Sequence, residues 1–250
     1  MVTRSTRAKA SPGSWGGHDK TILVLQGGGA LGAYQAGAYV ALSAAGIEPD
    51  WVAGVSIGAI NSTLIAGNEP ARRADRLREF WTRASSRSPF VPPSLFDPLR
   101  PWLNRVNFLG TATLGIPGFF DPRPWPPQLA PDGTPAALSY YDTSPLIRTL
   151  EELADFDLIN DRRVRLSLGA VNVHTGESTY FDNHQTVIEP AHVLASGALP
   201  PGFPPVTIDG EVYLDGGIAS NTPLAYVLEQ DFRLNALVLQ VDVFSGAGPV

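Results

Sequence analysis

Two apolar runs early in the chain each end in a glycine-rich turn, and this arrangement constrains the fold more than any other feature. The first run, residues 21–25, ends at Gln26 and three consecutive glycines. The second, residues 51–55, ends in a G-x-S-x-G sequence. Between them, small and apolar residues recur at helical spacing from Gly32 until Gly46. The pattern predicts a β-α-β unit, followed by a helix after the serine turn.

The predicted topology places the two turns side by side. Right-handed crossover connections make the two strands parallel, so both turns lie at the carboxyl edge of the sheet. In a G-x-S-x-G turn between a strand and a helix, the serine hydroxyl is exposed and the flanking glycines avoid side-chain clashes. The backbone N–H groups of Gly27, Gly28 and Gly29 can approach a ligand closely and point at a developing oxyanion. Ser56 is therefore the candidate nucleophile, with an anion-binding loop beside it.

The same glycines also fit a dinucleotide-binding fingerprint. Gly27-x-Gly29-x-x-Gly32 follows a strand and precedes a helix, as that fingerprint requires. Its acidic partner should end the second strand, whereas Glu48 and Asp50 precede that strand and so lie at the wrong edge of the sheet. A purely structural role, in which tight turns pack a helix onto a strand, is the other alternative. We favour the nucleophile because Ser56 occupies the edge where the acid would be needed.

Composition narrows the class of protein. The chain has 250 residues, 44% of them hydrophobic, with 25 glycines and 23 prolines, so we expect one main domain with many turns. A net charge of −6 argues against nucleic-acid binding, which normally needs a basic face. The absence of cysteine excludes disulfides and thiolate metal sites, and the four histidines are not spaced as metal ligands. We expect neither a metal nor a cofactor.

The flanking segments bear on location. Residues 1–20 carry basic residues, serines and glycines without an apolar h-region, so we predict a disordered basic tail before a domain at residues 21–250. No apolar stretch approaches the roughly 20 residues that span a bilayer. We expect a cytoplasmic protein. The arginine-rich pattern that begins at Pro70 favours a solvated surface helix, and peripheral contact of this helix with anionic lipid is left open. The chain stops soon after a predicted strand at residues 236–244, so we expect a longer parent protein trimmed there.

Residues 89–141 form an insertion rich in proline and aromatic residues. Long irregular segments in compact domains are usually functional or mobile. An apolar flap that gathers acyl chains over the site and a satellite hydrophobic core are the two interpretations left open. Beyond the insertion we predict helices that begin at residues 144, 191 and 222, strands at residues 164–173 and 178–181, and a hairpin at residues 206–214 that turns at Asp209-Gly210.

A serine nucleophile needs a base within hydrogen-bond reach, and Asp215 is the best candidate. The four histidines lie in the tail, at strand turns or inside a predicted helix, without a neighbouring sequence that fixes them near the serine. Asp215 ends an apolar strand, and the two glycines after it leave room around its carboxylate. Desolvation there would raise its pKa toward that of a useful base. Taken alone, an aspartate followed by glycines is more often only a turn.

Three motifs together resemble the patatin-like phospholipase family, and the similarity extends over residues 21–244. They are Gly27-Gly28-Gly29-Ala30-Leu31-Gly32, Gly54-Val55-Ser56-Ile57-Gly58 and Asp215-Gly216-Gly217, with support from residues 195–200 and 221–223. The resemblance implies a three-layer α/β/α fold with a mainly parallel central sheet, related to the α/β-hydrolase architecture. It also implies a catalytic dyad of Ser56 and Asp215 without histidine, and an oxyanion hole made by the glycine-loop amides. Many members have arginine or lysine where this chain has Leu31, so electrostatic help from a cation is not expected there.

The sequence therefore predicts a serine hydrolase that cleaves carboxylic esters of acyl lipids. Asp215 accepts the proton of Ser56, the serine attacks an ester carbonyl, and the amides of Gly28 and Gly29, with Gly27 and Ile57 as further donors, hold the oxyanion. Phospholipids, neutral glycerides and polyhydroxyalkanoate-type polyesters all remain as substrates. Outside this chemistry, a nucleotide-binding module and a lipid-binding module without turnover are the alternatives.

Overall fold

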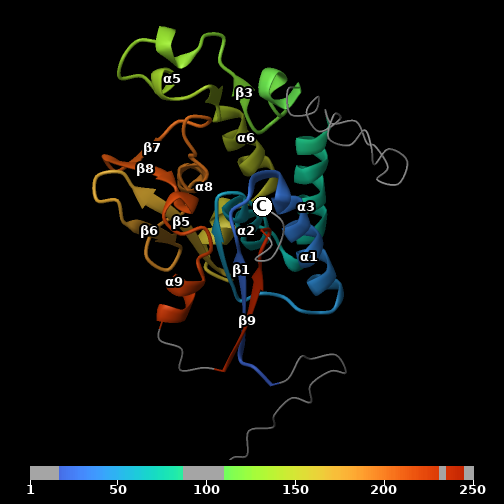
Figure 1. Cartoon of the computed structure of the whole chain (residues 1–250). Helices are drawn as coiled ribbons and strands as arrows, with labels where there is room; N and C mark the ends of the chain where they lie inside the picture. The colour runs from blue at the N-terminus through green and yellow to red at the C-terminus, as the bar shows by residue number, and fades with distance from the viewer. Residues whose placement is uncertain (1–16, 87–109, 231–234, 245–250) are drawn as a thin grey trace, which may run out of the picture.

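The computed structural model describes residues 17–86, 110–230 and 235–244, and these ranges form a layered α/β structure (Figure 1). Most of the predicted tail at residues 1–20 lies outside the described residues. So do residues 89–109 of the predicted insertion. Within the described ranges no helix has the length and apolarity that crossing a bilayer needs.

The main sheet is parallel through its centre and antiparallel on one side. Its strands run in the order β7-β8-β5-β2-β1-β9, and β6 also pairs with β5. The pairs β1–β2, β1–β9 and β2–β5 are parallel, whereas β5–β6, β5–β8 and β7–β8 are antiparallel. The strands are β1 (Lys20–Leu25), β2 (Trp51–Val55), β5 (Arg165–Asn172), β6 (Ser178–Asp182), β7 (Val206–Ile208), β8 (Glu211–Asp215) and β9 (Ala236–Val241).

Side chains of the central strands alternate between two hydrophobic cores, because successive residues of a strand point to opposite faces. Leu23 and Leu25 of β1 belong to the main core, and Ile22 and Val24 to a smaller core that includes Val227 of α9 (Leu224–Glu229). The main core contains residues of α1 (Gly32–Ala44), α2 (Ile57–Ala66), α3 (Pro70–Ser85), α6 (Ser144–Leu153), α7 (Phe156–Asn160) and α8 (Pro190–Ser196). The sheet thus lies between helical layers, which confirms the predicted three-layer α/β/α fold.

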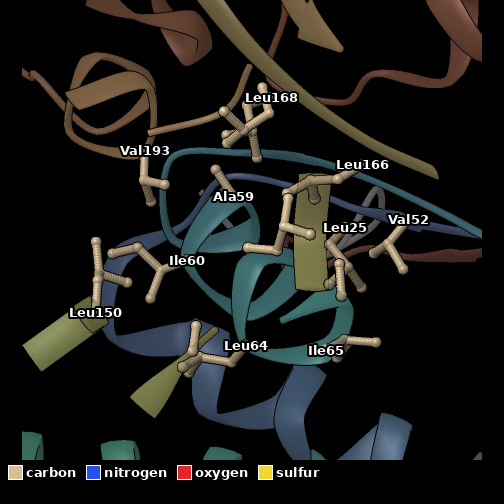
Figure 2. Close-up of a cluster of buried hydrophobic side chains, with 14 of the residues drawn as sticks. Leu25, Val52, Ala59, Ile60, Leu64, Ile65, Leu150, Leu166, Leu168 and Val193 are labelled. Carbon is tan, nitrogen blue, oxygen red and sulfur yellow. The ribbon is translucent and has the colours of Figure 1, made fainter. Parts of the chain in front are cut away.

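Helix α2 is the most deeply buried helix, and it begins at the residue after Ser56. All its residues are buried, including the polar residues Asn61, Ser62 and Thr63. Figure 2 shows Ala59, Ile60, Leu64 and Ile65 of α2 among strand residues such as Leu166. Burial of each such leucine or isoleucine contributes about 1.5–3 kcal/mol. The serine turn is therefore attached directly to a helix that lies inside the core.

Most predicted elements are confirmed within a residue or two. The predicted hairpin is formed by β7 and β8, and its turn residues Asp209 and Gly210 both have positive φ, at 52° and 84°, as a tight hairpin turn requires. Short elements that the sequence did not predict lie between residues 110 and 142, at the top of Figure 1. They are β3 (Asp121–Pro122), the 3-10 turn η3 (Pro127–Leu129), α5 (Pro135–Leu138) and β4 (Tyr141–Asp142), of which β3 and β4 pair.

Candidate active site

Ser56 lies in a sharp turn between β2 and α2, with the left-handed backbone angles φ 57° and ψ −123°. A residue other than glycine rarely adopts positive φ, and such strain persists only where the surroundings enforce it. Two glycines make this turn possible. A β-carbon on Gly54 would overlap the carbonyl group of Gly58, and one on Gly58 would overlap the carbonyl oxygen of Leu25.

Ser196 of α8 connects the serine turn to strand β5 through two hydrogen bonds. The Ser56 N–H donates to Ser196 Oγ at 3.0 Å, and that hydroxyl donates to the carbonyl oxygen of Gly169 at 2.6 Å. Ser196 is fully buried, so loss of its hydroxyl would leave both groups without partners. Ser196 lies within residues 195–200, which support the family resemblance but for which the sequence predicted no role. Its side-chain contacts depend on how α8 packs against β5, which sequence spacing does not show.

Strand β5 brings Asp215 to the serine turn. Val55, which precedes Ser56, pairs with Gly169, and Asp215 pairs with the next residue of β5, Ala170. Because β6 covers the opposite edge of β5, strand β8 continues the edge that β2 occupies. The last residues of β2 and β8 therefore pair with neighbouring residues of β5. The predicted nucleophile and the predicted base meet there, and the Ser56 hydroxyl is close enough to the Asp215 carboxylate to lower the pKa of that group.

The environment of Asp215 favours a basic carboxylate. The residue is only 2% exposed, and burial raises its pKa above the ordinary range. The Ser56 hydroxyl and the Gly217 N–H, which donates to Asp215 Oδ1 at 2.7 Å, lower the pKa in part, but the net direction is upward. A carboxylate with a raised pKa can accept a hydroxyl proton more readily than an exposed one.

Backbone amides without protein partners lie beside Ser56. A β-carbon on Gly27 would lie 3.2 Å from the Ser56 Cβ, so the glycine loop is in contact with the serine. In the part of the chain that the structure describes, the N–H groups of Gly28 and Gly29 have no acceptor, and neither does that of Ile57 at the start of α2. Such amides, at helix starts where the dipole is positive, can stabilise a negative oxygen.

The predicted use of the Gly27 amide as an oxyanion donor is wrong. Its N–H donates to the carbonyl oxygen of Asn221 at 3.0 Å, so that amide is already engaged. The remaining motif glycines serve close packing. A β-carbon on Gly32 would overlap Ile57, one on Gly216 would lie 2.5 Å from the Gly169 oxygen, and one on Gly217 would lie 2.8 Å from Asn221 Oδ1.

Ser56 and Asp215 line a largely apolar cavity of about 430 Å³. The glycine loop, α2, α3, α6 and α8 all contribute to its wall. So do Phe119 and Phe120, which belong to the predicted insertion and pack against Phe203. Whether the rest of the insertion acts as a flap stays a prediction. The cavity walls include Gly29, Ala30, Ala33, Ile57, Ile60, Phe80, Trp81, Ala84, Ile116, Thr143, Leu146, Leu194, Ala198 and Leu199.

A second buried carboxylate, Asp182, lies outside this cavity. Burial raises its pKa, but hydrogen bonds from the His184 N–H and from Ser167, together with the charge of Arg165, more than offset that effect and hold the pKa below its usual range. Asp182 Oδ2 also accepts from the Tyr226 hydroxyl at 3.0 Å. The two buried carboxylates thus have pKa values shifted in opposite directions, which distinguishes a candidate base from a structural anion.

The acidic and histidine side chains that the alternative interpretations require make contacts away from the glycine loop and the cavity. Glu48 accepts from Tyr39 at 2.7 Å and pairs with Arg73 at 2.6 Å, and Asp50 accepts from the Thr21 N–H at 2.8 Å, so neither faces the glycine loop. None of the four histidines lines the cavity. His192, for example, accepts from the Glu189 N–H at the start of α8. Among the described residues no group of three or more acidic or histidine side chains is arranged to hold a metal ion.

Comparisons with known proteins found a family model, a curated relative and a structural neighbour. A family model described as "Patatin-like phospholipase" matches residues 23–228. Lysophospholipase NTE1 of Meyerozyma guilliermondii is 24% identical over 223 residues, a match that covers 89% of this chain and 12% of that protein. The chain therefore spans only a small part of that relative's length. The crystal structure of VipD from Legionella pneumophila aligns with a TM-score of 0.45 at 18% identity, over 89% of this chain and 49% of VipD.

Proposed function

Because the chain belongs to the patatin-like phospholipase family, we propose that it hydrolyses carboxylic ester bonds of acyl lipids, with Ser56 as nucleophile and Asp215 as general base. One observation carries the assignment. A buried carboxylate with a raised pKa lies beside a serine on a strained turn, and both residues line an apolar cavity. A purely structural aspartate would instead be expected to have its charge stabilised, as Asp182 has.

The first half of the reaction transfers the acyl group to the enzyme. Asp215 takes the proton from Ser56 Oγ as that oxygen bonds to the ester carbonyl carbon. The carbonyl oxygen becomes an oxyanion, for which the N–H groups of Gly28, Gly29 and Ile57 are the available donors. When the tetrahedral intermediate collapses, the ester C–O bond breaks and the proton held by Asp215 passes to the leaving alcohol.

The second half releases the fatty acid. Water enters the place of the leaving alcohol, Asp215 accepts one of its protons, and the resulting hydroxide attacks the acyl-enzyme carbonyl. The same amides hold the second oxyanion. When this intermediate collapses, Ser56 recovers its proton from Asp215 and the carboxylic acid leaves. One water is consumed for each ester, and no other reactant enters this scheme.

The cavity supports a substrate with one acyl chain at the site. A volume of about 430 Å³ lies within the range of roughly 300–1,000 Å³ that is typical of small-molecule sites. Burial of each methylene contributes about 0.8 kcal/mol, so an acyl chain would supply most of the binding free energy. The relative named lysophospholipase makes a single-chain phospholipid the first substrate to test.

Peripheral membrane contact receives little support from the arginine-rich helix. Several arginines of α3 form ion pairs within the protein, such as Arg76 and Arg83 with Glu79, and Arg73 with Glu48. These pairs favour the interpretation of α3 as a surface helix of the folded domain.

Hydrolysis of lysophospholipid and of a neutral monoacyl ester by wild type and by Ser56→Ala tests the proposal. We expect the substitution to lower kcat by about 10³-fold or more with the fold intact. Ser62→Ala is the matched control, because the Ser62 hydroxyl lies on helix α2, which follows Ser56, is fully buried and has no hydrogen-bond partner among the described residues. That control should keep wild-type activity. A Ser56→Ala variant with full esterase activity would overturn the assignment.

A further inference from the structure

Asn221 holds the glycine loop through two hydrogen bonds. It follows β8 and the 3-10 turn η4 (Gly216–Ile218), and its backbone oxygen accepts from the Gly27 N–H at 3.0 Å. Its side-chain Nδ2 donates to the Gly27 carbonyl oxygen, also at 3.0 Å. The two residues are so close that a β-carbon on Gly27 would overlap Asn221 Oδ1. Both polar groups of one glycine are therefore bound by one residue.

Gln26, which precedes the glycine loop, is held by further hydrogen bonds. Gln26 Oε1 accepts from the backbone N–H groups of Val243 and Phe244, at 2.9 and 3.2 Å. Gln26 Nε2 donates to Thr222 Oγ1 at 3.0 Å. A β-carbon on Gly28 would overlap a methyl group of Val243. The loop thus lies between the segment after β9 and the segment around Asn221, with little freedom to rotate.

The planarity of the peptide bond gives the Asn221 contact a consequence at Gly28. The Gly27 carbonyl and the Gly28 N–H belong to one trans peptide, so they point in opposite directions. With the carbonyl oxygen bound to Asn221 Nδ2, the Gly28 N–H points away from Asn221. It has no acceptor in the described ranges. Rotation of this peptide would break the Asn221 bond.

We propose that Asn221 is a positioning residue for the oxyanion hole, whose side-chain amide fixes the Gly27-Gly28 peptide so that the Gly28 N–H faces the reacting carbonyl oxygen. The proposal rests on the proposed function. It also connects the two halves of the site. The Asp215 carboxylate accepts from Gly217, and Gly217 packs against Asn221, so one short loop carries the base and orients the oxyanion donor.

Asn221→Asp tests the proposal, because it keeps the size of the side chain and replaces the donor with an oxygen that repels the Gly27 carbonyl. We expect kcat to fall by about 10²–10³-fold, as for loss of one oxyanion donor, with KM nearly unchanged. The affinity of a trifluoromethyl ketone with a matched acyl chain should fall by the same factor, because its adduct with Ser56 carries the oxyanion. Asn221→Ala, which deletes the donor without repulsion, should lie between Asn221→Asp and wild type.

Asn160→Asp is the matched control, since Asn160 Nδ2 also donates to backbone carbonyls, those of Phe156 and Ile188, but away from the cavity. It should lower stability without changing kcat or ketone affinity per folded molecule. Unchanged kcat and ketone affinity in folded Asn221→Ala would overturn the proposal, as would losses in both Asn221 variants that only follow the folded fraction. Ser56-dependent hydrolysis by wild type would still uphold the proposed function in either case.

Discussion

Asp215→Asn should inactivate the protein and make it more stable at neutral pH. The substitution keeps the shape of the side chain and its acceptor for the Gly217 N–H, but it removes the negative charge and the proton acceptor. Loss of a general base lowers kcat by about 10²–10⁴-fold. Loss of a buried, destabilised charge should raise the free energy of unfolding. Activity and stability are expected to change in opposite directions at one residue.

The sign of the stability change follows from the raised pKa of Asp215. A group whose pKa is higher in the folded state contributes stability below its unfolded pKa, and that stability is lost as pH rises through the folded pKa. At neutral pH the wild type therefore carries an ionised carboxylate that burial disfavours. Each pKa unit of the upward shift corresponds to about 1.4 kcal/mol, and the side chain is too buried for solvent to screen the effect. The advantage of asparagine should disappear below the ordinary carboxyl range, about pH 4.

Urea unfolding of wild type and Asp215→Asn at pH 7 and at progressively lower pH measures this difference, with the m-value as a check that the unfolded states match. The pH profile of wild-type kcat/KM gives the independent readout. Activity should be lost with falling pH above the range of an ordinary aspartate, because the base is protonated there. A variant that is less stable than wild type at pH 7, or one that keeps the wild-type rate, would refute the reasoning.

Three further substitutions have defined outcomes. Gly28→Ala should impair hydrolysis because its methyl group meets Val243, and Val243→Ala in the same chain should restore part of kcat; additive losses in the double variant would contradict this contact. Leu146→Trp should narrow the cavity, so that kcat/KM falls more for long acyl esters than for short ones, by about 10–200-fold for each methylene excluded. If the dependence of kcat/KM on acyl-chain length did not change, that result would argue against the cavity as the acyl site. Asp182→Asn should lower the free energy of unfolding by about 3–5 kcal/mol at neutral pH, because it leaves Arg165 without its buried partner. This loss of stability should shrink as pH falls through the depressed pKa of Asp182, whereas serine reactivity per folded molecule should not change.

Local sequence signals predicted the elements that position Ser56. The runs at residues 21–25 and 51–55 are buried on both faces of a parallel sheet, and their short length and the glycines that follow them indicated strands. Gly54 and Gly58 indicated the turn at Ser56, because a β-carbon at either position would overlap backbone atoms. Asp209-Gly210 marked the hairpin that delivers Asp215, since both residues require positive φ. These features depend on residues close in sequence.

Contacts between distant segments could not be predicted in the same way. The bond between Asn221 and Gly27 exists because the segment after η4 lies beside the loop that follows β1, which no local pattern encodes. For that reason the Gly27 N–H was wrongly expected to donate a hydrogen bond to the oxyanion. The brace from Ser196 to Ser56 depends likewise on the position of α8. The short strands β3 and β4 have two residues each, too few for any periodicity to appear.

The central claim is that Ser56 is an activated nucleophile, and intact-mass spectrometry after incubation with a long-chain fluorophosphonate tests it most directly. We predict one covalent adduct on wild type, slower labelling of Asp215→Asn, full labelling of the Ser62→Ala control, and no adduct on Ser56→Ala. Labelling of Ser56→Ala at the wild-type rate, or folded wild type that takes no adduct, would contradict the account.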